Sequence, residues 1–91
     1  MTRTAPVYTS AVIHFETDPH GRGWVLTLNG RDAQAVQAIG SMRERVPSNL
    51  GSQPPAWVVA AARRHARAAG VRVPARGGWA QRGAFTWAAD V

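Results

Sequence analysis

The chain contains no cysteine and no lysine. Without cysteine it cannot form a disulfide, use a thiolate nucleophile or build a cysteine-based zinc site. No apolar run approaches the roughly 18 residues that a membrane-spanning helix needs, and the N-terminus has no signal-peptide pattern. We therefore expect no membrane association and a cytoplasmic location.

Large aliphatic side chains are also scarce. Leu, Ile, Val and Phe together number 17 of the 91 residues, and Ala alone numbers 17. A chain of this length buries about 60–65% of the surface that it exposes when unfolded, so its stability is small unless a partner adds to it. We expect residues 1–91 to form a single small domain, with residues 1–6 disordered.

Catalytic and metal-binding patterns are missing as well. The five acidic residues are scattered, and there is no phosphate loop, nucleophile elbow or His-Glu-x-x-His motif. The three histidines (His14, His20 and His65) match no metal-ligand spacing. We therefore predict a protein that is not an enzyme and that uses no cofactor and no metal. No sequence motif supports the catalytic alternative, a small nuclease or transferase.

Two alternating segments near the N-terminus predict an antiparallel hairpin. In residues 7–17 every second side chain from Val7 to Phe15 lies on one face, and residues 23–29 repeat this pattern with Trp24 as the first core residue. The Asp-Pro-His-Gly sequence between them has the residue types that favour a turn.

The middle of the chain predicts two helices. Four apolar residues at helical spacing predict the first helix over residues 32–46: Ala35, Ile39, Met42 and Val46. The alanine-rich segment 56–69 predicts the second helix, with Gly70 as its terminator. Residues 47–55 are rich in Pro, Ser and Gly, and we expect them to form the interhelix loop.

The C-terminal part predicts two short strands, at 71–73 and 84–88, on either side of a Gly- and Arg-rich loop over 75–83. The predicted fold class is therefore α+β. A small antiparallel sheet, made of the N-terminal hairpin and the C-terminal strands, packs against two helices in the order ββααββ.

The strongest functional signal is charge. The formal net charge is +6, and every basic residue is arginine. This composition is also what a GC-rich genome encodes, but arginine still carries a permanent charge and a donor pattern that matches phosphate. On the second predicted helix, Arg63, Arg64 and Arg67 fall within about 100° of arc around the helix axis. They form either a stripe that binds phosphate groups or an ordinary solvated face of the helix.

A second basic segment lies in the predicted loop, where Arg76 and Arg82 flank Trp79. Trp79 could stack on a base, or it could fold back onto the sheet as part of the core. We predict a non-catalytic module that binds nucleic acid, DNA or RNA, mainly without sequence preference. Its phosphate contacts come from arginines of both segments, with Trp79 stacking.

The alternative hypothesis is a protein-binding adaptor or inhibitor of the kind that phages and mobile elements encode. Exposed tryptophans are good interface anchors, and Trp57 and Trp79 are the candidates. Its partner would be an acidic protein surface, or a second copy of the chain that pairs along the edge of the C-terminal strand.

Overall fold

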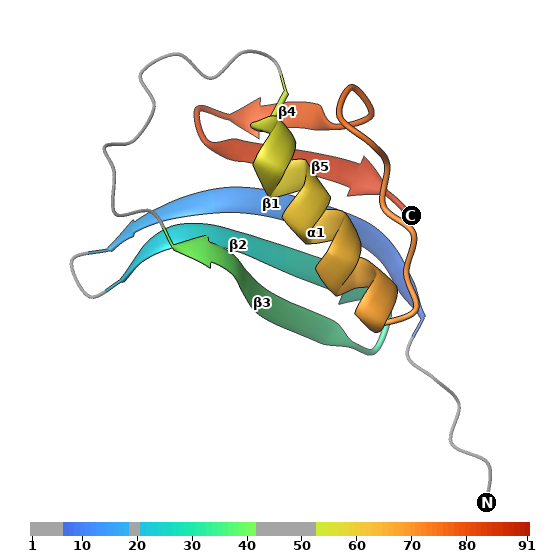
Figure 1. The fold of residues 1–91 in the computed structure, drawn as a ribbon. Coiled ribbons are helices and arrows are strands. Elements are labelled where there is room, and N and C mark those ends of the chain that lie inside the picture. The colour runs from blue at the N-terminus through green and yellow to red at the C-terminus, as the bar shows by residue number, and fades with distance from the viewer. Residues whose placement is uncertain (1–6, 19–20, 42–52) are drawn as a thin grey trace, which may run out of the picture.

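The computed structural model describes residues 7–18, 21–41 and 53–91. These residues form five antiparallel strands in one sheet, with a helix across one of its faces (Figure 1). In chain order, the elements are β1 (Tyr8–Asp18), β2 (Gly21–Gly30), β3 (Gln34–Ser41), α1 (Ala56–Ala68), β4 (Ala80–Gly83) and β5 (Thr86–Asp90). The order of the strands across the sheet is β3-β2-β1-β5-β4.

The predicted N-terminal hairpin is confirmed. β1 and β2 pair along their whole length, from Tyr8 opposite Gly30 to Asp18 opposite Gly21. The side chains that alternate along β1 behave as the pattern predicts, because Ala11, Ile13 and Phe15 are all buried on the helix-facing side.

The predicted helix over 32–46 is wrong, and with it the order ββααββ. Residues 34–41 form β3, which pairs antiparallel with β2, and residues 42–46 lie outside the described residues. Ala35 and Ile39 share a face in a strand as they do in a helix, because a spacing of four residues fits both periods. The open edge of β2 also offers backbone hydrogen bonds that an extended segment can satisfy and a helix cannot.

Three other expectations concern the connecting segments. Residues 71–73 are not a strand, and residues 80–83 of the predicted loop form β4. Residues 1–6 and the first six residues of the predicted interhelix loop, 47–52, lie outside the described residues.

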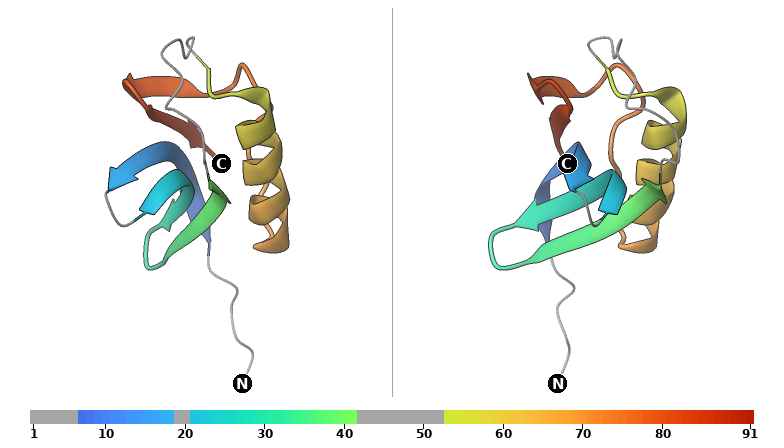
Figure 2. Two further views of the ribbon diagram at one scale, coloured as in Figure 1. Left: turned by 60° about the vertical axis from the view of Figure 1, so that its left-hand side comes forward. Right: turned by 90° about the vertical axis from the view of Figure 1, so that its left-hand side faces the viewer.

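The predicted second helix is confirmed as α1, and it forms its own layer over the sheet (Figure 2). Its buried residues are Val58, Val59, Ala61, Ala62 and Ala66. Small side chains predominate on this face, so the helix can lie close to the sheet. The bulk of the core comes from the sheet, where the indole rings of Trp24 and Trp87 are fully buried with their centroids 5.9 Å apart.

The helix ends as its sequence predicts. Gly70 adopts a left-handed conformation with φ of 78°, which a residue with a Cβ atom adopts at a cost. The Gly70 N–H donates to the Arg67 carbonyl, and the Val71 N–H donates to the Ala66 carbonyl, both at 2.9 Å. This is a Schellman motif, and it turns the chain back along the helix.

In the part of the chain that the structure describes, no helix is long and apolar enough to cross a membrane.

Candidate functional site

The positive charge is unevenly distributed along the chain. Residues 1–44 contain four arginines and four carboxylates, whereas residues 45–91 contain seven arginines and a single carboxylate, that of Asp90. The whole net charge of +6 therefore belongs to the second half, which contributes α1, β4, β5 and the segment between α1 and β4.

Three of these arginines line one hollow, which we call the arginine hollow. Arg63 and Arg67 come from one face of α1, and Arg72 comes from the segment that follows Gly70. The hollow has a volume of about 450 Å³, and Gly70, Val71 and Val73 complete its lining. Three permanent charges thus lie around a partly apolar concave surface.

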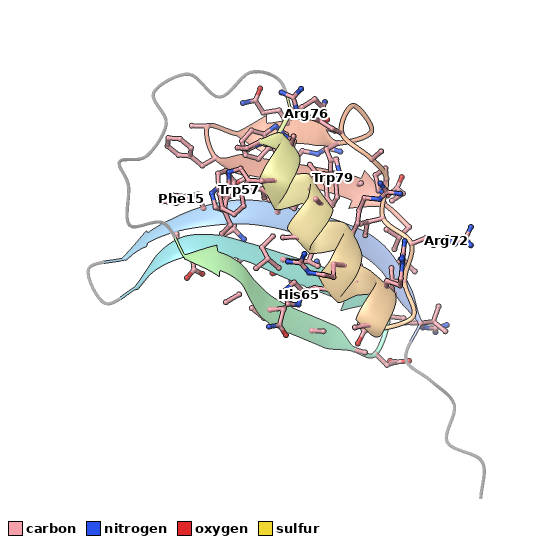
Figure 3. All side chains as sticks on the ribbon, viewed as in Figure 1. Phe15, Trp57, His65, Arg72, Arg76 and Trp79 are labelled. Atoms are coloured by element: carbon pink, nitrogen blue, oxygen red, sulfur yellow. The ribbon has the colours of Figure 1, made fainter. Side chains whose placement is uncertain are left out.

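The Schellman motif is what brings the two segments together. After Gly70 the chain reverses, and residues 71–79 run back beside α1 toward its N-terminal end (Figure 1). Arg72 therefore lies beside the C-terminal half of the helix (Figure 3). Arg63 and Arg67, four residues apart, present their side chains on the same side of α1.

Arg76 extends the basic surface to the other end of α1. Its Nε donates a hydrogen bond of 3.0 Å to the carbonyl of Pro54, just before the helix begins. Figure 3 shows Arg76 near the start of the helix and Arg72 beside its second half. A helix of 13 residues is about 20 Å long. The arginines from Arg67 to Arg76 are therefore spread along roughly one helix length.

A glutamine side chain holds this returning segment in place. The Gln53 Nε2 donates to the Trp79 carbonyl at 2.7 Å, and its Oε1 accepts from the N–H groups of Gly77 and Trp79, at 2.8 and 3.2 Å. One amide thus satisfies three backbone groups of the loop from the chain just before α1. Gln53 gives no sequence signal of this role.

The arginines of the hollow are not neutralised by the described acidic residues. Among the side chains that the structure describes, the close contact between a basic and an acidic group is the one from His14 Nε2 to Glu16 Oε1, at 3.1 Å, on the sheet. Arg63, Arg67 and Arg72 are exposed and make no ion pair or hydrogen bond with a described residue. Their charge is available to a ligand.

The predicted site residues are therefore brought together only in part. Arg63 and Arg67 share the hollow, and the structure adds Arg72, which was not among the predicted residues. Arg64 is exposed but does not line the hollow, because it lies 100° around the helix from Arg63. Arg82 is exposed on β4, at an irregularity in the pairing with β5.

The two candidate tryptophans have opposite environments. Trp79 is 3% exposed, and its indole N–H donates to the Pro74 carbonyl at 3.1 Å, so it packs in the core and offers no face for stacking. Trp57 is 49% exposed and lies over Gly40 of β3, where an added Cβ atom would come within 2.6 Å of the ring.

We expect the substitution Gln53→Leu to lower the free energy of unfolding by about 1–3 kcal/mol, because two N–H groups and one carbonyl of the loop lose their partner. Amide hydrogen exchange at Gly77 and Trp79 should accelerate. Gln81→Leu is the matched control, since Gln81 is exposed and no described residue bonds its side chain. If the Gln53→Leu protein is as stable as the Gln81→Leu protein, the three hydrogen bonds of the Gln53 side chain do not stabilise the loop.

Searches against family models, curated proteins and solved structures find no match to this chain.

Proposed function

We propose that the chain is a non-catalytic module that binds nucleic acid through its phosphate backbone. The observation that carries this proposal is the arginine hollow, in which three guanidinium groups from two segments surround one concave surface. Like charges repel, so a cluster without a described carboxylate partner favours a polyanionic ligand.

The residue type and the lining both suit a phosphodiester chain. Guanidinium groups donate pairs of parallel hydrogen bonds to phosphate oxygens. Val71 and Val73 line the same hollow, and they supply apolar surface for a sugar between two phosphates. Arg76 lies farther along the returning segment, toward the other end of α1, where it could contact a more distant phosphate of the same strand.

We propose binding with little sequence preference. Sequence is read through base edges or by stacking on bases, whereas phosphate contacts carry no sequence information directly. The arginines of the hollow supply charge, and Trp79, the tryptophan that the sequence suggested for stacking, is buried. The site therefore favours DNA or RNA backbones of any sequence.

The test is a salt series with labelled duplex DNA and single-stranded RNA of mixed sequence, followed by fluorescence anisotropy. Three phosphate contacts on a duplex should give a slope of about −3 in log affinity against log salt, at roughly −0.9 for each contact. Binding that is undetectable at about 50 mM salt, or that does not respond to salt, would contradict the proposal.

The second candidate function is a protein-binding adaptor, and the observation that favours it is the half-exposed indole of Trp57. Trp57 and Arg64 lie on the same side of α1, since they are seven residues apart, which is close to two full turns. An acidic protein surface could contact both. Trp57→Ala should then abolish capture of the protein partner, while substitutions in the arginine hollow should not.

A further inference from the structure

The sheet has one long edge without charge. β3 is the last strand on its side of the sheet, and its eight residues, Gln34–Ser41, include no charged side chain and no proline. Edge strands present unpaired backbone N–H and C=O groups, and proteins usually protect them with charges, prolines or short length. Among the described residues, β3 has none of these three protections, and the irregularity in its pairing with β2 is confined to its last part, opposite Trp24 and Val25.

Exposed apolar side chains lie on both sides of this edge. Val36 of β3 is 63% exposed on the sheet face away from the helix. On the helix side, the half-exposed ring of Trp57 lies over Gly40. Apart from Val7 and Val91, near the two ends of the described chain, these are the large apolar residues that the described structure exposes.

The opposite edge of the sheet is different. β4 has four residues, all of them exposed, and it carries Arg82. A short edge with a charge is a poor template for another strand. The C-terminal edge, which the sequence suggested as a self-association site, is therefore the less suitable one.

We propose that β3 pairs antiparallel with β3 of a second copy of the chain, so that the two sheets become continuous. A second copy matches this edge because pairing about a two-fold axis needs no complementary sequence. Charge also permits it, since β3 itself carries no charged side chain, so two copies of this strand do not repel each other.

The size of the contact sets the expected strength. An interface made of one strand edge with Val36 and Trp57 from each copy should bury less than about 1,200 Å² of surface, which is the lower end of the range for specific interfaces. We therefore expect a dissociation constant in the micromolar range. A two-fold axis normal to the joined sheet leaves both helices on the same side. If the proposed function also holds, the two arginine hollows would face one nucleic acid together.

The first experiment is the molar mass of the whole chain by light scattering over a concentration series, after nuclease treatment and in about 0.3 M salt. A mass that rises from monomer to dimer supports the proposal, and a monomer at about 0.5 mM overturns it. Val36→Lys should weaken the dimer at least tenfold, because it puts one positive charge from each copy on the same face of the paired edge strands.

Thr27→Lys is the matched control. Thr27 is the cross-strand neighbour of Val36, so the added charge is on the same sheet face but one strand away from the edge. This variant should dimerise like the unmodified chain. Equal weakening by both lysines would mean that charge repulsion, and not strand pairing, controls the mass, and would overturn the proposal.

The absence of cysteine allows a second, independent test. In an antiparallel pair with two-fold symmetry, one residue of β3 lies on the axis opposite its own copy, at a distance that a disulfide can span. Replacing each position of β3 with cysteine in turn should therefore give one strongly cross-linked dimer. Gln81→Cys in β4 is the control. No cross-link from β3, or equal cross-linking from Gln81→Cys, overturns the proposal.

The result is separable from the proposed function. Substituting Arg63, Arg67 and Arg72 should leave the molar mass unchanged, because they line the hollow formed by α1 and the segment after it, and none of them belongs to β3. Conversely, a monomeric chain that binds nucleic acid would refute the pairing alone.

Discussion

The combined substitution of Arg63, Arg67 and Arg72 with glutamine is expected to reduce affinity for nucleic acid by about 100-fold at about 0.1 M salt. The three guanidinium groups line one hollow, so their phosphate contacts and the accompanying counterion release are lost together. The slope of log affinity against log salt should become less steep by about 3 for a duplex. A glutamine side chain keeps much of the length of an arginine side chain and some of its hydrogen-bonding capacity. The substitution therefore removes mainly the positive charge and the paired N–H donors of the guanidinium group.

Single substitutions separate the site from net charge. Arg67→Gln and Arg31→Gln remove the same charge, but Arg67 lines the hollow, and Arg31 is exposed between β2 and β3. We expect a several-fold loss for Arg67→Gln and less than a twofold loss for Arg31→Gln. Equal losses in a parallel anisotropy titration would mean that binding depends on overall charge and that the hollow is not a site.

Thermal melts of these exposed variants should match that of the unmodified chain within about 0.5 kcal/mol, because surface substitutions without described partners seldom change stability by more. A variant that loses both binding and stability would not count as evidence for the site.

Local signals in the sequence predicted the elements whose pattern fits a single period. The alternation in β1 has a period of two, and the alanine-rich stretch before Gly70 has the propensity and the terminator of a helix. The helix predicted over residues 32–46, part of which is β3, was wrong for the opposite reason. Its spacing between Ala35 and Ile39 fits either period, and the deciding factor was the open edge of β2, which the sequence does not display.

The candidate site was predictable only as far as it is local. Arg63 and Arg67 are neighbours on one helix, so a helical projection finds them. Arg72 lies in Val-Arg-Val, which reads as a strand, and it joins the hollow because the chain reverses at Gly70. Because a Schellman motif reverses the chain, the residues that follow Gly70 lie beside the helix. The hydrogen bond from the Gln53 side chain to Trp79 joins residues that are 26 positions apart, and it has no local signature in the sequence.

The role of Trp79 shows why a motif with arginine, glycine and tryptophan is ambiguous. A stacking residue needs an exposed ring, but a core with few large aliphatic residues needs its aromatic side chains inside. Here the core requirement prevails, since Trp24, Trp79 and Trp87 are all buried. The exposed indole is that of Trp57, in the first turn of α1.

Replacing Trp24 with alanine should have the largest effect on stability. The ring is fully buried, with its centroid 5.2 Å from that of Phe15 and 5.9 Å from that of Trp87. Truncating such a residue costs about 3–5 kcal/mol. At about 0.05–0.15 kcal/mol per residue, a domain of this size has about 5–14 kcal/mol in total, and a helix that buries mainly alanine against the sheet places it near the lower value.

We therefore expect the Trp24→Ala chain to lose its near-ultraviolet circular dichroism and its cooperative thermal transition at physiological temperature. Trp57→Ala is the matched control. Its ring is 49% exposed, so the same truncation should cost no more than about 1.5 kcal/mol and leave a cooperative transition. Similar melting temperatures for the two variants would contradict a core centred on the sheet. If instead only Trp24→Ala unfolds, then the helix is held by the aromatic cluster of the sheet, and the arginine hollow depends on that cluster for its shape.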